Sequence, residues 1–182
     1  MKNSNATRVF HALGREERLE IFELILTSRD VGICPLEISK NIQIPRCKLS
    51  SQLKILSAAG LVNKLVAGYT PLYFPNGVNI DQFLNFMNGP MSKSDAAKAL
   101  QALSEDTRLR MFRLIRKVSQ EGIVPKVISA ELDIEYVLML YHLDRLLDAG
   151  LIEKKGGWGS SKFFPSERKV NYLFTHLNYY LS

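Results

Sequence analysis

Side chains suited to binding nucleic acid are concentrated in the stretch RCKLSSQLKILSAAG, residues 46–60. Leu49, Leu53 and Leu56 recur there at spacings of four and three, which predicts a helix with one inward apolar face. The outward side chains include no acid and combine cations for phosphates with polar groups for base edges. They are Arg46, Lys48, Ser50, Ser51, Gln52 and Lys54. We expect this face to bind DNA, although an ordinary solvated helix surface has a similar composition.

A second basic segment is EKKGGWGSSKF, residues 153–163. Lys154, Lys155 and Lys162 flank a glycine-rich loop that carries Trp158. The pattern predicts a hairpin whose lysines contact phosphates, and a solvated hairpin without a ligand is the alternative.

The chain contains an internal duplication with an offset of 90 residues. HALGREERLEIFELI, residues 11–25, aligns with QALSEDTRLRMFRLI, residues 101–115, and the match continues without a gap. Of the 64 aligned positions between 12 and 75, 21 are identical. Two copies at so long a period indicate a pair of domains rather than a solenoid.

The boundary between the copies is the segment NGPMSKSD, residues 88–95, with a Gly-Pro break followed by helix-start residues. We therefore expect one domain over 1–89, the candidate DNA-reading domain, and another over 90–182. Hydrophobic residues make up 46% of the chain and charged residues 23%, which is typical of folded globular proteins.

Each copy is expected to fold in the same order, with helices first and a hairpin before the last helix. In the first copy the expected helices are 6–13, 15–28, 35–42, 46–59 and 79–87, and the strands 61–66 and 72–74. In the second they are 95–103, 105–120, 125–132, 135–149 and 168–181, with strands 151–155 and 161–164. The fold class is mainly α with small β wings (α+β), as two tandem winged helix-turn-helix domains.

Two segments resemble the ArsR-type winged-helix regulators of bacteria and archaea. They are ALSEDTRLRMFRLI in the second copy and IPRCKLSSQLKILSAAGLV in the first, which are similar to the opening and the DNA-reading helix of that family. The resemblance covers both copies. It implies a transcriptional regulator, usually a repressor, in which two winged helices pair through their first and last helices to read double-stranded DNA.

The two reader helices differ at the outward positions. In YVLMLYHLDRLLDAG, residues 136–150, the inward leucines become Met139, Leu143 and Leu146, so the scaffold is kept. The outward positions become apolar, as an interaction patch of Val137, Leu138, Leu140 and Tyr141 beside Tyr136. Asp133 and Glu135 in the preceding turn would repel phosphate. We expect the other copy, another chain or a small apolar ligand to cover this face.

Other kinds of chemistry have little support in the sequence. Cys34 and Cys47 are too few for a disulfide framework, and no second Cys or His in a ligand motif accompanies them, so we expect no metal and no cofactor. No phosphate loop and no nucleophile with its base is recognisable, which argues against an enzyme. Without a signal peptide or a run of about 18 apolar residues, we expect a cytoplasmic protein.

A sequence-specific DNA-binding regulator is therefore the first interpretation, and the net charge of +6 suits it. Either one chain forms a pseudo-dimer, or two chains form a homodimer that brings both first-copy reader helices to DNA. A small-molecule or protein effector fits either arrangement. The alternative is a protein-interaction adaptor that no longer depends on DNA.

Overall fold

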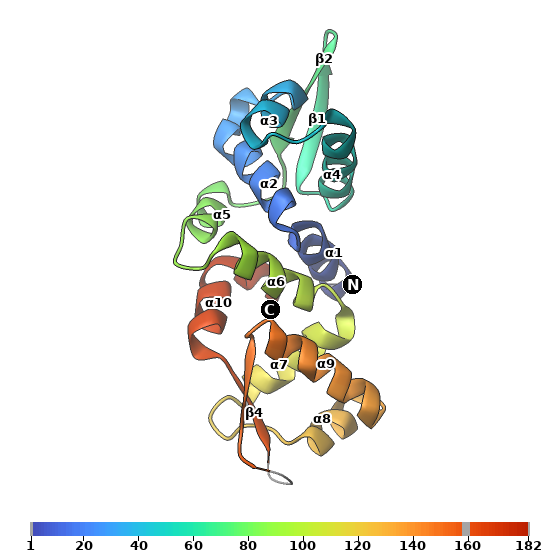
Figure 1. The fold of residues 1–182 in the computed structure, drawn as a ribbon, viewed down its shortest axis with the longest axis vertical. Coiled ribbons are helices and arrows are strands. Elements are labelled where there is room, and N and C mark those ends of the chain that lie inside the picture. The colour runs from blue at the N-terminus through green and yellow to red at the C-terminus, as the bar shows by residue number, and fades with distance from the viewer. Residues whose placement is uncertain (1, 158–160, 182) are drawn as a thin grey trace.

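The protein was studied as a computed structural model, which describes residues 2–157 and 161–181. It is mainly helical, with two antiparallel hairpins of two strands each (Figure 1). The expected α+β composition is therefore confirmed. None of the described helices combines the length and apolar character needed to cross a membrane.

The two copies show the same order of elements. The first comprises α1 (Lys2–Leu13), α2 (Glu16–Ser28), the short 3-10 helix η1 (Arg29–Val31), α3 (Pro35–Ile42), α4 (Arg46–Ala58), β1 (Val62–Ala67), β2 (Thr70–Pro75) and α5 (Ile80–Met87). The second comprises α6 (Lys93–Leu103), α7 (Asp106–Lys117), α8 (Pro125–Leu132), α9 (Tyr136–Asp148), β3 (Ile152–Lys155), β4 (Lys162–Pro165) and α10 (Glu167–Leu181). Two differences from the expected bounds exceed two residues: α1 begins at Lys2 rather than residue 6, and α7 ends at Lys117 rather than residue 120.

The turn before α4 is built in the same way as the turn before α9. Gln43 and Asp133 both adopt the left-handed conformation that ends a helix. The Ser39 hydroxyl then donates to the Ile44 carbonyl at 2.7 Å, and the Ser129 hydroxyl makes the same bond at 2.7 Å. These local bonds fix the angle at which α4 and α9 leave the turn.

Each hairpin is anchored to the helices by one short bridge and one glycine. Ile33 pairs with Tyr73 in the first copy, as Ile123 pairs with Phe163 in the second. The preceding Gly32 has φ of 72°, and a Cβ there would lie 2.5 Å from the Phe74 ring. Both the positive φ and the close approach therefore require glycine at this position.

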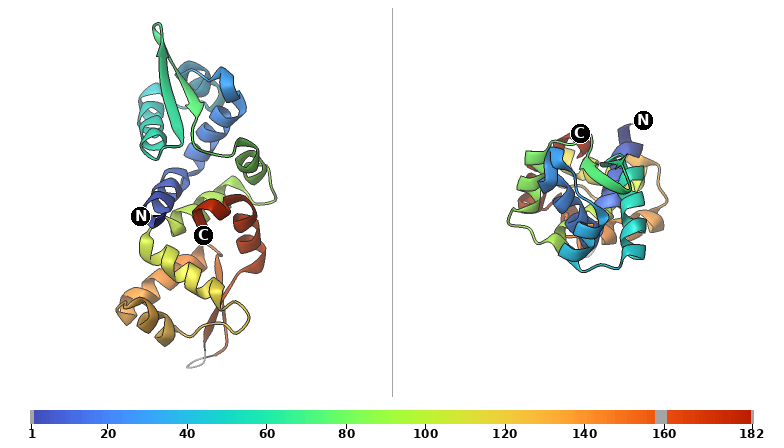
Figure 2. Two further views of the ribbon diagram at one scale, coloured as in Figure 1. Left: turned by 180° about the vertical axis from the view of Figure 1, so that it is seen from behind. Right: turned by 90° about the horizontal axis from the view of Figure 1, so that it is seen from above.

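The two copies pack against each other through their first and last helices (Figures 1 and 2). Between the first helices, α1 crosses α6; between the last helices, α5 lies against α10. The α5–α10 contact includes Tyr172, which stacks on Phe86 with ring centroids 5.7 Å apart and donates a hydrogen bond to its carbonyl. Lys93 also forms a 2.6 Å ion pair with Glu23 across the boundary. A single cluster of buried apolar side chains runs through both copies.

Candidate nucleic-acid interface

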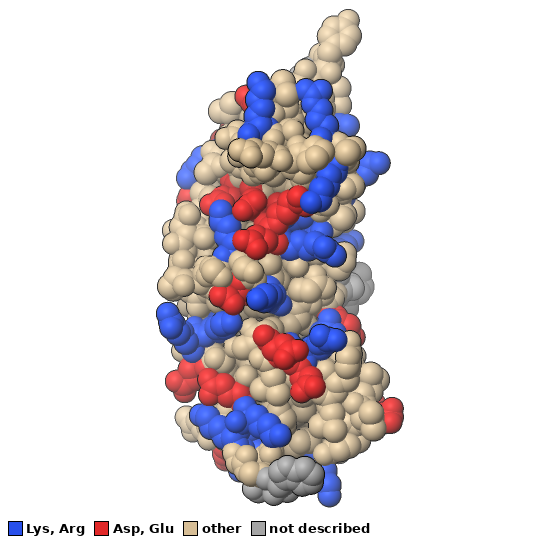
Figure 3. All heavy atoms as spheres, viewed as in Figure 1, with Lys and Arg blue, Asp and Glu red and all other residues tan. Residues whose placement is uncertain are grey.

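The outward surface of α4 carries most of the polar side chains expected there. Leu49, Leu53 and Leu56 are buried in the core of the first copy, as the spacing predicted. Opposite them lie exposed side chains that we call the α4 face: Arg46, Lys48, Ser50, Ser51 and Lys54. The α4 face contains no acidic residue, and in this region Figure 3 shows basic side chains.

Gln52, which was also predicted to point outward, is half-buried, unlike the exposed residues of the α4 face. Its Oε1 accepts a hydrogen bond of 3.2 Å from the guanidinium of Arg18 on α2. Arg18 is buried and also donates to the carbonyls of Ala12 and His11 at the end of α1. Through Arg18, Gln52 therefore ties α4 to α1 and α2, and its amide oxygen is occupied by this contact.

The cations of the α4 face are not equivalent. Lys48 lies 2.7 Å from Glu17 on α2, with side chains 55% and 30% exposed. Such a pair contributes little to stability, but it partly neutralises the lysine. Arg46 and Lys54 form no ion pair within the described residues, which leaves them as the principal cations for an external anion.

The surface of α9 is apolar and open to solvent, as expected. Val137 is 68% exposed and Tyr141 51%, and Tyr136, Leu138 and Leu140 are exposed beside them. We call these residues the α9 face. Figure 3 shows uncharged surface in this region. The first copy does not cover it, so of the three expected covers only another chain or a ligand remains.

His142 occupies the position in α9 that matches Gln52, and it is buried. Its Nδ1 has no hydrogen-bond partner among the described residues, and Glu105 Oε2 lies 3.7 Å away. Burial lowers the pKa of His142, and the Arg108 cation acts in the same direction, whereas the Glu105 carboxylate opposes them. The imidazole is therefore held neutral to lower pH than in an unfolded chain.

This burial predicts an acid-sensitive fold. Because the folded-state pKa of His142 is depressed, stability is complete above the unfolded value of about 6.5 and is lost as pH falls from there to the folded pKa. The loss is about 1.4 kcal/mol for each unit between the two pKa values. In His142→Gln, urea unfolding at pH 7.5 and 5.5 should show a smaller drop in stability than in the wild type. His11→Gln, at an exposed site, is the control, and an undiminished drop in His142→Gln would contradict the assignment.

The lysines of the second hairpin are exposed but partly engaged. Lys162 donates to the Glu121 carbonyl at 3.0 Å, and Lys155 lies 3.7 Å from Glu153. Lys154 has no such contact within the described residues and is the hairpin cation best placed for a phosphate. The expected contribution of Trp158 lies outside the described residues. The first hairpin instead exposes Leu65, Val66 and Tyr69.

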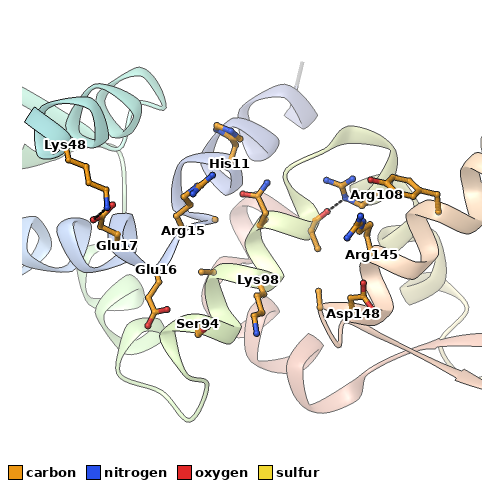
Figure 4. Close-up of a pocket in the computed structure, with 16 residues that line it drawn as sticks. His11, Arg15, Glu16, Glu17, Lys48, Ser94, Lys98, Arg108, Arg145 and Asp148 are labelled. Atoms are coloured by element: carbon orange, nitrogen blue, oxygen red, sulfur yellow. Dashed lines mark hydrogen bonds and ion pairs between the residues drawn. The ribbon is translucent and has the colours of Figure 1, made fainter. Parts of the chain in front are cut away.

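A groove of about 940 Å³ joins the two copies between α4 and α9. Lys48 lies at one end and Arg145 toward the other (Figure 4), and Tyr141 also lines the groove. Residues at the end of α1 and on α6, including Gly14 and Gln101, also line it. The helices α4 and α9 lie on the same side of the molecule, as Figures 1 and 2 show.

Cys34 is the N-cap of α3, where its backbone N–H donates to Glu37 at 3.0 Å, and Cys47 is exposed on α4. Both thiols are free. No group of three or more Cys, His, Asp or Glu side chains that could hold a metal occurs among the described residues.

The local sequence patterns missed Arg18 and its partners, although the identity of Arg18 and Arg108 at the 90-residue offset was a usable signal. In both copies this arginine binds the carbonyl before the α1–α2 or α6–α7 turn. Comparison with models of known protein families and with curated proteins gives no match for this chain.

Proposed function

We propose that the protein is a sequence-specific DNA-binding transcriptional regulator built from two winged helix-turn-helix domains, with α4 as the reader helix. The observation that carries the proposal is the α4 face: a row of exposed cations and hydroxyls without an acid, on a helix held by buried leucines. A helix of this kind fits the major groove, where cations meet phosphates and polar groups meet base edges. Repression in the cytoplasm, the usual role in the ArsR-type family that it resembles, is part of the proposal.

The packing of the two copies supports a pseudo-dimer within one chain. The contacts of α1 with α6 and of α5 with α10 bring α4 and α9 to the same side. The two hairpins extend toward opposite ends of the long axis (Figure 1). We propose that one duplex runs along this side, with α4 reading its bases.

The direct test is binding of the purified chain to a fluorescent duplex from upstream of its own gene, across a salt series. We expect the logarithm of the affinity to fall linearly with the logarithm of the salt concentration, and a scrambled duplex to bind at least about 1,000-fold more weakly. Failure to bind either duplex at 50 mM salt would overturn the proposal.

The α9 face favours a second candidate, a protein-interaction adaptor. Contiguous exposed apolar side chains are unfavourable on a monomer and mark contact surfaces. An adaptor of this kind would use the α9 face for docking and would not depend on the α4 face. The two functions are separated by whether changes on α4 or on α9 abolish activity in the cell.

The α9 face also predicts self-association. We expect light scattering of the wild type to give a mass above the 20.6 kDa of one chain. Leu138→Ser with Tyr141→Lys should return the mass to one chain, because it removes apolar area and adds a charge at the contact. Val31→Ser, at an isolated exposed position in the first copy, is the matched control. A wild type that stays at one chain over the whole concentration range would contradict this prediction.

A further inference from the structure

A row of basic side chains lines one side of the groove between α4 and α9. Figure 4 shows Lys48, Arg15, His11 and Arg145 following one another along this side. The acidic Glu16 and Asp148 lie toward the opposite side, and Glu17 is paired with Lys48. Arg15 and Arg145 are exposed cations in this row, whereas Lys48 is paired with Glu17, so the charge of the row comes mainly from the two arginines.

Arg15 is the least expected member of the row, because its place in the fold disfavours a cation. It is the N-cap of α2, and its side chain makes no capping hydrogen bond. The N-terminus of a helix carries a partial positive charge, so a cation there is destabilising. The charge of Arg15 also acts against the neighbouring buried Arg18.

The second copy shows the favourable solution at the same position. Glu105, which matches Arg15 at the 90-residue offset, is the N-cap of α7. Its carboxylate accepts hydrogen bonds of 3.1 Å from the backbone N–H groups of Thr107 and Arg108. The first copy thus has an exposed arginine where the same scaffold accommodates a capping acid. A residue that costs stability locally is expected where it serves a function.

We propose that this basic row binds the sugar-phosphate backbone of the DNA between α4 and α9, with Arg15 as the central phosphate contact. The inference rests on the proposed function and extends the contact surface beyond the α4 face. Arginine suits the role because its planar guanidinium donates two parallel hydrogen bonds to one phosphate. Arg145 stands at the far end of the row, exposed and 5.1 Å from the Tyr141 ring.

The decisive variant is Arg15→Ser, because the fold and the DNA contact should respond in opposite directions. Arg15 has extended backbone angles, φ −138° and ψ 133°, which suit a capping serine. We expect Tm to rise by about 2–4 °C. The slope of the logarithm of DNA affinity against the logarithm of salt concentration should become shallower by about 0.9, the value for one lost phosphate contact. If that contact has no effect at 1 M salt, this slope corresponds to about fivefold weaker binding at 0.15 M salt.

Two controls separate a phosphate contact from a general charge effect. Arg15→Lys keeps the cation and should bind DNA within about twofold of the wild type. Arg110→Ser removes one exposed charge from α7 outside the groove, since Arg108 lines the groove and Arg110 points to a different side of the helix. It should leave the salt dependence of DNA affinity unchanged. Equal losses in Arg15→Ser and Arg110→Ser would overturn the inference.

The remaining outcomes distinguish the inference from the proposed function. If Arg46→Ala with Lys54→Ala loses specific binding while Arg15→Ser binds as the wild type does, the inference fails and the function stands. If the wild type binds no duplex, both fail. Titration with inorganic phosphate tests whether the row binds a free phosphorylated ligand instead of DNA. Saturable phosphate binding that Arg15→Ser abolishes, with DNA affinity unchanged, would assign the row to such a ligand. That outcome would overturn the backbone contact.

Discussion

Replacing Arg46 and Lys54 together with alanine is expected to abolish sequence-specific DNA binding while the fold stays intact. Both side chains are exposed on the α4 face, and neither forms an ion pair within the described residues. One good bidentate contact to a base discriminates by about 1–3 kcal/mol, and each lost phosphate contact weakens binding further. We therefore expect affinity for the cognate duplex to fall at least about 1,000-fold, to the level of a scrambled duplex, as measured by fluorescence anisotropy.

The matched control removes two exposed cations from the second copy, as Arg110→Ala with Lys117→Ala on α7. It changes the net charge equally, so it reports the long-range effect of charge alone. Both double variants should keep the wild-type Tm, since surface changes of this kind alter stability by about 0.5 kcal/mol or less. If the α4 variant still distinguishes cognate from scrambled DNA, α4 is not the reader helix.

Lys48 is left out of this test because of a contact that α4 alone does not reveal. Its pairing with Glu17 depends on how α2 crosses α4. Substituting Lys48 would remove one cation from the surface and leave an unpaired carboxylate beside it. A loss of DNA binding could then come from the repulsion of phosphate by Glu17, not from a missing contact.

Much of the secondary structure could be predicted because strong local signals mark it. The bounds of α3 and α8 agree with the expected ranges, since each helix has proline in its first turn and ends at a left-handed residue. Because of the 90-residue repeat, each element could be predicted from two aligned segments, which made both hairpins recognisable although their turn sequences differ. The largest error at a helix start is in α1, because residues 2–5 contain no apolar side chain to extend the pattern.

The direction of Gln52 could not be predicted from periodicity alone. It is adjacent to the stripe of Leu49, Leu53 and Leu56, so a small rotation of the helix decides whether it is inside or outside. Arg18 of α2 decides it here by donating to the Gln52 amide oxygen. In the second copy the same place holds His142, whose Nδ1 is left without a partner. Such contacts depend on tertiary packing between helices that local sequence patterns do not encode.

The groove was also beyond the reach of local patterns, because residues far apart in sequence form it. Lys48, Arg15 and Arg145 line one groove only because α1 crosses α6 and brings the two copies together. The crossing itself depends on Gly14, which is buried at the end of α1. The aligned residue in the second copy is Ser104, so this glycine belongs to the contact between the copies and not to the repeated scaffold.

Gly14→Ala is therefore expected to destabilise the whole chain. An added Cβ would lie 2.7 Å from Gln101 Oε1, 2.9 Å from Gln101 Cα and 2.9 Å from the Phe10 carbonyl oxygen. The side-chain oxygen can move, but the Gln101 Cα belongs to α6 and the Phe10 carbonyl to α1, so α6 must shift away and the end of α1 must also adjust to accommodate the methyl group. Overpacking of this kind costs about 1–3 kcal/mol, which urea unfolding can measure.

The same substitution provides a test of the pseudo-dimer. Gly157→Ala is the control for stability, because a Cβ at Gly157 meets nothing within 4 Å, and the wild type is the control for DNA binding. If DNA is bound across both copies, Gly14→Ala should weaken binding even where the chain remains folded, because the spacing between α4 and α9 changes. If the α4 face binds alone, affinity per folded molecule should equal that of the wild type. Unfolding and DNA titration of these two variants at one temperature thus separate the contribution of the α1–α6 crossing to stability from its contribution to the DNA surface.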